Sequence, residues 1–157
     1  MLENCESAKE RWGGVNDIID RWLKERQNLI VQFCEISQLE DLNDIDRIVR
    51  KMERLCEILV DYVSAGHFEV YDQLVLEAKE FNDGGVELAE KIIPKIQKTT
   101  SEALKFNDRF DVTEKSEKGV VVLHEDLSTL GEVLEERFEL EDVLIETLHN
   151  AHADQVA

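Results

Sequence analysis

The chain has 157 residues, a length that suits one domain with a sizeable hydrophobic core. One proline and seven glycines are too few turn residues for a sheet of many short strands, so the composition favours an all-helical fold. The 18 basic and 36 acidic residues give a formal net charge of −18, which disfavours binding to nucleic acid or an anionic membrane and favours a basic protein partner.

The cysteines and the apolar runs bear on the compartment. Cys5, Cys34 and Cys56 are widely spaced and form no Cys-x-x-Cys pair, so they predict neither a disulfide framework nor a thiolate zinc site. The first residues contain no apolar signal segment, and the longest apolar runs, such as 119–123, are too short to span a bilayer. We therefore expect a cytoplasmic protein that is neither exported nor membrane-spanning.

Helical periodicity organises the first half of the chain. Paired glycines at 13–14 predict the end of a short N-terminal helix, and apolar residues at helical spacing predict a long helix over 15–36. Residues 37–43 are polar and read as a connection, in which Asn43 is the expected N-cap of the next helix. That second helix continues to about residue 78.

The second half begins with a turn at 82–85, which reads Asn-Asp-Gly-Gly. A third helix follows over 86–104, and Pro94 is expected to kink or interrupt it. Residues 107–118 are charged and aperiodic, which predicts a surface loop. A regular apolar repeat from Leu123 to Leu148 then predicts the last long helix.

These segments predict the architecture. We expect residues 1–157 to form a single all-α domain, an antiparallel up-down four-helix bundle with a short additional N-terminal helix. Residues 150–157 are expected to be a frayed tail.

Residues 61–71 depart from the helical pattern. This segment places a carboxylate, two phenols, a hydroxyl, a glycine and an imidazole among good helix formers. Ser64 and Gly66 both lower helix propensity, and a glycine costs roughly 1 kcal/mol relative to alanine in a helix interior. The segment therefore predicts a bend, a junction between two helices or a close backbone approach.

Charged residues also occupy positions on apolar stripes. Arg26 does so on the first long helix, and Arg137 and Glu141 do so on the last. A buried, unpaired charge would cost several kcal/mol, so these residues must pair or face a solvated cavity, and Asp61 and His67 are the expected complements. These five residues form the predicted polar seam. The sequence leaves open whether the seam is structural or a ligand groove, and whether it mediates a weak homodimer. His67 is either a satisfied interior imidazole, the interpretation that we favour, or a functional group in an open groove.

Catalytic and metal chemistry find little support in the residues. Glu146-x-x-His149 matches one half of the motif of di-iron carboxylate bundles, but neither His67 nor His124 follows a glutamate at that spacing. Ser64 lies three residues before His67 without an orienting third group or oxyanion donors. We expect no cofactor, no metal and no enzymatic activity. A carboxylate-histidine metal-binding bundle or enzyme stays the alternative.

Three blocks of sequence stand out, at residues 20–23 (DRWL), 59–71 (LVDYVSAGHFEVY) and 130–142 (LGEVLEERFELED). They resemble the regulator of sigma D family. Two further blocks, at 11–14 (RWGG) and 148–152 (LHNAH), resemble the branch of that family called AlgQ. The resemblance covers nearly the whole chain.

The resemblance implies a function. It implies an anti-sigma factor that binds the C-terminal, −35-recognising region of the primary sigma factor. Such binding would block the contacts of that region with promoter DNA and with core RNA polymerase, and so regulate transcription. The region is basic because it binds DNA, which fits the charge of −18.

The resemblance also implies a binding site. In the family the carboxylate at the position of Asp61 is tied to sigma binding, and the residues around it match here. The partner-binding residues that we expect are Asp61, Tyr62, Ser64, Gly66, His67, Phe68, Tyr71 and Trp22. The aromatic members are candidate anchors by residue type. Arg137, Glu141 and Asp142 also match the family blocks, and the resemblance leaves open whether they contact the partner or only shape the groove.

Overall fold

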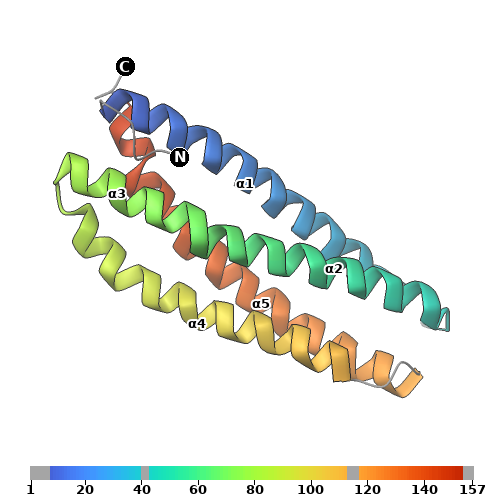
Figure 1. The fold of residues 1–157 in the computed structure, drawn as a ribbon. Helices are drawn as coiled ribbons and strands as arrows, with labels where there is room; N and C mark the ends of the chain where they lie inside the picture. The colour runs from blue at the N-terminus through green and yellow to red at the C-terminus, as the bar shows by residue number, and fades with distance from the viewer. Residues whose placement is uncertain (1–7, 40–42, 113–116, 154–157) are drawn as a thin grey trace.

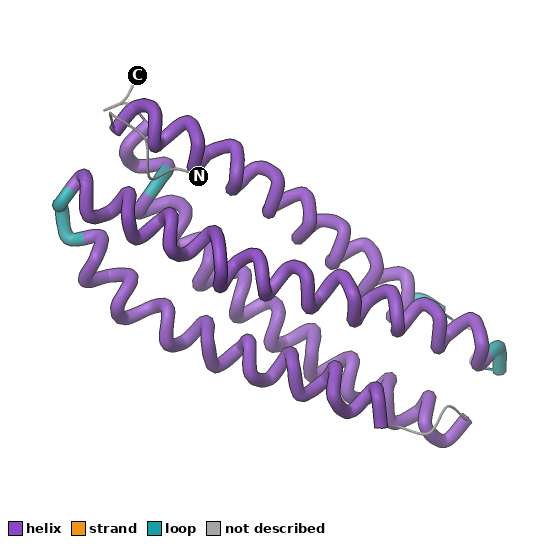
Figure 2. Tube along the Cα trace, viewed as in Figure 1, coloured by secondary structure: helices purple, strands orange, loops and turns teal. Residues whose placement is uncertain are grey.

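The computed structural model describes residues 8–39, 43–112 and 117–153. The helical elements are α1 (Ala8–Ser37), α2 (Ile45–Ala65), the π-helical turn η1 (Gly66–Val70), α3 (Tyr71–Phe81), α4 (Gly85–Val112), α5 (Glu117–Leu148) and the 3-10 turn η2 (Asn150–His152). No strand occurs within these described ranges, as the colouring in Figure 2 shows.

Four rods make up the molecule, because α2, η1 and α3 follow one another end to end (Figure 1). The rods lie side by side and successive rods run in opposite directions, so that α1 begins and α5 ends at the same end of the bundle. This arrangement confirms the predicted all-α bundle. None of the described helices has an apolar stretch long enough to cross a bilayer.

The helix break expected at Gly13–Gly14 is wrong, because α1 runs without interruption from Ala8 to Ser37. Trp12 stacks on His149 with ring centroids 4.4 Å apart, and Val15 is fully buried. These contacts hold the first turns of α1 against the bundle. They outweigh the roughly 1 kcal/mol that a glycine costs inside a helix.

The helix ends also differ from expectation. The N-cap of α2 is Asp44 rather than Asn43, and its side chain accepts a hydrogen bond from Arg47 N at 3.2 Å. α4 continues through Pro94 without interruption and extends to Val112, beyond the start of the predicted 107–118 loop. Phe106 and Phe110 account for the extension, because they lie one helical turn apart and are both buried.

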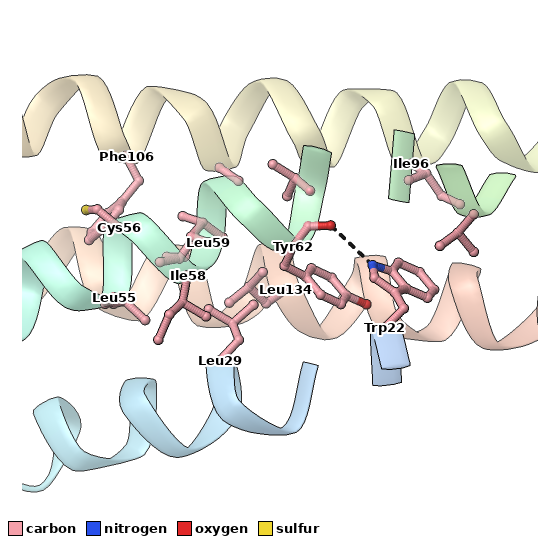
Figure 3. Close-up of a cluster of buried hydrophobic side chains, with 14 of the residues drawn as sticks. Trp22, Leu29, Leu55, Cys56, Ile58, Leu59, Tyr62, Ile96, Phe106 and Leu134 are labelled. Atoms are coloured by element: carbon pink, nitrogen blue, oxygen red, sulfur yellow. Dashed lines mark hydrogen bonds between the residues drawn. The ribbon is translucent and has the colours of Figure 1, made fainter. Parts of the chain in front are cut away.

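The core confirms the apolar stripes. Each position of the predicted repeat in α5 is at most 4% exposed: Leu123, Leu127, Leu130, Leu134, Arg137, Glu141, Leu144 and Leu148. Figure 3 shows Leu29 of α1, Leu59 of α2 and Leu134 of α5 within one buried cluster. The same interior also contains the polar groups described next.

Candidate functional site

A buried carboxylate, Glu141 of α5, is the centre of a polar network that crosses the bundle. Its Oε1 accepts a hydrogen bond from the Tyr62 hydroxyl at 2.6 Å, and its Oε2 accepts one from the Tyr71 hydroxyl at 2.5 Å. Arg26 Nη2 lies 3.4 Å from Oε1. Arg137 Nε lies 3.3 Å from Oε2 as an ion pair without hydrogen-bond alignment. We call these five residues the Glu141 network.

Each tyrosine of the Glu141 network also accepts a hydrogen bond from an arginine. Arg26 Nε donates to the Tyr62 hydroxyl at 2.9 Å, and Arg137 Nη2 donates to the Tyr71 hydroxyl at 2.8 Å. Arg137 Nη1 also reaches α4, where it donates to Thr100 Oγ1 at 2.5 Å. The Glu141 network therefore contacts all four rods and fixes their relative positions.

Burial and charge set the protonation of the Glu141 network. Burial raises the pKa of Glu141, while the neighbouring guanidinium groups and hydroxyl donors act against that rise. Burial and the charge of Glu141 also raise the pKa of Tyr62 and of Tyr71, so both hydroxyls stay protonated donors. Asp142 accepts a 2.6 Å hydrogen bond from Arg26, which brings the local formal charge to two positive and two negative groups. The charges are thus compensated internally.

The π-helical turn η1 explains the unusual composition of its segment. A Cβ atom at Gly66 would lie 2.9 Å from the Tyr71 hydroxyl oxygen and 3.0 Å from Trp22 Cζ2, so only glycine leaves enough space. Trp22 stacks on Tyr62 with centroids 4.8 Å apart and donates from Nε1 to the Tyr62 carbonyl at 3.2 Å (Figure 3). The predicted close backbone approach is therefore confirmed. This close packing at Gly66 supports the tyrosine rings of the Glu141 network.

The outward side of the same segment is a surface. Asp61, His67, Phe68 and Glu69 are exposed, and Ser64 is half-buried. Phe68 is 77% exposed, the largest exposed fraction among the exposed large hydrophobic residues that the structure describes. Its ring packs edge-to-face against that of His67, with centroids 5.0 Å apart, and an exposed aromatic ring can serve as an anchor for a protein partner. We call these five residues the 61–69 surface.

The 61–69 surface is strongly acidic. Partial burial and the carboxylates of Asp61 and Glu69 raise the pKa of Glu25 on α1, which places the three carboxylates within range of one another's charge. Asp61 also lines a hollow of about 550 Å³ with residues of α2 and α4, and every other charged residue that lines it is acidic. These carboxylates repel one another, and a positively charged partner would reduce their repulsion.

The structure divides the predicted partner-binding residues into two groups. Asp61, Ser64, His67 and Phe68 belong to the 61–69 surface. The other four lie inside the bundle: Trp22 (2% exposed), Tyr62 (0%), Tyr71 (3%) and the buried Gly66. A partner that docks on this conformation cannot reach the side chains of the second group. They support the surface from beneath.

The predicted polar seam is only partly right. Arg26, Arg137 and Glu141 meet as expected, but the placement of Asp61 and His67 in the seam is wrong, because both side chains are exposed and the arginines share Glu141 instead. The favoured interpretation of His67 as an interior imidazole is wrong for the same reason, and the alternative, a functional group in an open groove, stays a prediction. Arg137 and Glu141 are at most 1% exposed, so these two side chains cannot contact a second copy of the chain in this conformation.

A second buried polar group, which the sequence alone did not predict, lies where α1 begins and α5 ends. His149 Nδ1 lies 2.8 Å from Glu77 Oε2, His149 Nε2 lies 3.0 Å from Asn16 Oδ1, and Trp12 Nε1 donates to the His149 carbonyl at 2.9 Å. Burial raises the pKa of Glu77, and the hydrogen bond with His149 opposes this rise. We call these four residues the His149 cluster.

The His149 cluster bears on the metal alternative. Both ring nitrogens of His149 already face oxygen partners, whereas Glu146 is exposed and accepts a hydrogen bond from Asn150. Within the part of the chain that the structure describes, no group of three or more histidine, cysteine, aspartate or glutamate residues is arranged to hold a metal ion. The geometry of His149 is that of a structural contact between helices.

Residues 150–152, which we expected to fray, form the 3-10 turn η2. His152 is 2% exposed, lies 2.6 Å from Asp83 Oδ2 through Nε2, and stacks on Phe81 with centroids 3.8 Å apart. The hydrogen bond from His152 lowers the pKa of Asp83. Residues 154–157 lie outside the described residues.

Comparison with known proteins gives consistent relatives. A sequence profile of the family described as "Regulator of RNA polymerase sigma(70) subunit, Rsd/AlgQ" matches residues 1–149. Proteins named "Regulator of sigma D" are similar over most of their length. That of Yersinia pseudotuberculosis serotype O:1b is 34% identical over 148 residues, covering 93% of this chain and 88% of the relative. That of Pectobacterium carotovorum is 31% identical over 154 residues, covering 96% and 99%.

Proposed function

The chain belongs to the Rsd/AlgQ family of regulators of the RNA polymerase sigma(70) subunit, and we propose that it is an anti-sigma factor that binds the C-terminal, −35-recognising region of the primary sigma factor. The 61–69 surface is the proposed contact. In this proposal the protein acts in the cytoplasm, stoichiometrically and without catalysis. The AlgQ branch is our proposed placement within the family, and Trp12 and His149, from the two blocks that suggest it, stack on each other.

One observation carries the proposal: an exposed apolar ring, Phe68, lies on an acidic surface. A region that reads promoter DNA must be basic, so its own charge would be attracted by Glu25, Asp61 and Glu69. Opposite charges raise association rates, while a few apolar anchors supply most of the affinity. Phe68 is the only apolar side chain among the five residues of the 61–69 surface, and so it is the proposed anchor.

The proposed mechanism is competition. The acidic surface would cover the basic residues with which the sigma region contacts promoter DNA and core polymerase. The sigma region could then not make those contacts while it is bound to this protein. Housekeeping promoters would then be used less. The protein needs no direct contact with nucleic acid, which its charge of −18 would oppose.

The test is calorimetric titration of the full chain with the isolated C-terminal region of the primary sigma factor. Asp61→Ala should weaken binding by about tenfold or more, because it removes a carboxylate beside the proposed anchor. Glu90→Ala is the matched control, since Glu90 is an exposed carboxylate of α4 that lines none of the hollows described. Both variants change the net charge equally. Equal affinities for the two variants would contradict the assigned surface.

A further inference from the structure

An open groove lies between α1 and α5. One hollow of about 320 Å³ is lined by the apolar side chains of Ile30, Phe33, Leu134 and Phe138 together with residues of its rim. A second hollow of about 510 Å³ adjoins it, because Phe33 lines both, and its other walls are mostly polar. The groove therefore combines an apolar half with a polar half.

Gly131, like Phe33, lines both hollows. A Cβ atom there would lie 2.8 Å from Phe33 Cζ, so the Phe33 ring rests directly on the backbone of α5. Phe33 therefore lines the groove where its apolar and polar halves meet. Ile30, at the edge of the apolar hollow, stays 41% exposed, although it belongs to the side of α1 that faces α5. An exposed apolar side chain beside an unfilled apolar hollow is typical of a docking site.

The charge of the rim restricts what could fill the groove. Glu132, Glu135 and Glu139 are exposed, and none of them forms an ion pair with a lysine or arginine among the described residues. The remaining rim carboxylate, Asp142, is paired with Arg26. This rim attracts positive charge and repels an anionic membrane, nucleic acid or a second copy of a chain with a charge of −18.

We propose that the α1–α5 groove binds an amphipathic, basic helix of a second protein partner, distinct from the sigma region. An apolar side chain of that helix enters the hollow beside Ile30, and a lysine or arginine enters the hollow beside Ser37. Those two positions are seven residues apart on α1, about 10 Å at a rise of 1.5 Å per residue. The apolar side chain and the cation are therefore about two helical turns apart on the docking helix.

A synthetic peptide tests this proposal. The probe is a fluorescently labelled helical peptide of roughly 18 residues with leucine at its centre and lysine about two turns to either side, titrated against the full chain by anisotropy. Ile30→Glu should weaken binding by about tenfold or more, because it places a carboxylate in the apolar hollow. Val31→Glu adds the same charge at a neighbouring position that is 45% exposed and lines neither hollow, and it should change affinity by at most about twofold.

Controls separate the groove from general attraction to an acidic surface. Circular dichroism checks that both variants are folded, and if Ile30→Glu is not, Glu135→Lys, which reverses a rim charge shared by both hollows, takes its place with the same expected loss. Equal affinities for Ile30→Glu and Val31→Glu would overturn the proposal, as would equal binding of a peptide with glutamate in place of lysine. A wild-type dimer that Ile30→Glu dissociates would assign the groove to a second copy and overturn it too. The peptide should bind Asp61→Ala unchanged, so this result is independent of the anti-sigma test.

Discussion

Residues 61–71 supply both two buried tyrosines of the Glu141 network and the 77% exposed ring of Phe68. Tyr62 and Tyr71 point inward and hold Glu141, whereas Asp61 and Phe68 point outward on the 61–69 surface. The two regions differ in how their charge is compensated. Glu141 and the adjacent Asp142 compensate the two arginines of the Glu141 network, while the carboxylates of Asp61 and Glu69 repel that of Glu25, which Arg21 offsets only in part.

This difference separates stability from recognition. Internal compensation makes each member of the Glu141 network costly to remove, because its partner would be left buried and unpaired. The acidic 61–69 surface contributes little to folding and is available to a partner. Substitutions in the two regions should therefore have opposite consequences, with large losses of stability inside and losses of binding alone outside.

The largest effect is expected for Arg137→Ala, inside the Glu141 network. It leaves Glu141 with one fewer counter-charge at 0% exposure, so the free energy of unfolding should fall by about 3 to 5 kcal/mol in urea denaturation. Arg109→Ala is the control, because Arg109 is 60% exposed in its ion pair with Asp126 and should cost at most about 1 kcal/mol. Similar small losses for both variants would remove the stated contrast between the two regions.

A smaller effect is expected at the backbone between the two regions. Gly66→Ala places a methyl group against Tyr71 and Trp22, and such overpacking should lower the free energy of unfolding by about 1 to 3 kcal/mol. Gly13→Ala, on α1, meets no atom within 4 Å and should instead stabilise the protein by about 0.5 to 1 kcal/mol. If both substitutions stabilise, then the close approach at Gly66 does not constrain the segment.

The smallest effect concerns the repulsion on the surface. The pKa of Glu25 is raised above its ordinary 4.5, first by partial burial and then by the carboxylates of Asp61 and Glu69. A raised pKa in the folded state means that this group favours folding below pH 4.5 and loses that contribution as pH rises through its folded value. Asp61→Asn should shift the Glu25 pKa downward in a carboxyl NMR titration, and Glu90→Gln should not. An unchanged Glu25 titration would show that the carboxylates do not form one cluster.

Periodicity accounts for what could be predicted from the sequence. The repeat in α5 predicted that Arg137 and Glu141 face the interior, because an α-helix keeps a fixed angle between successive residues. The π-helical turn breaks that rule, since its extra residue rotates all later positions relative to earlier ones. His67 therefore faces outward and Tyr71 inward, which no α-helical count would give.

The His149 cluster was missed for a different reason. Its members come from α1, α3 and the end of α5, and sequence spacing does not show which distant polar residues meet. A partial signal was present, because Glu77 lies three residues after the buried Leu74 and one before the buried Ala78. A carboxylate on that stripe needs a partner, but only the fold identifies it as His149.

The most direct test of the central claim is the footprint of the partner on the protein. Adding the unlabelled C-terminal region of the primary sigma factor to the isotopically labelled chain should shift the amide NMR signals of Asp61, Ser64, His67 and Phe68. Signals of the α1–α5 groove, such as that of Ile30, should stay in place. A footprint on the groove or on the His149 cluster, with the 61–69 surface unchanged, would contradict the account.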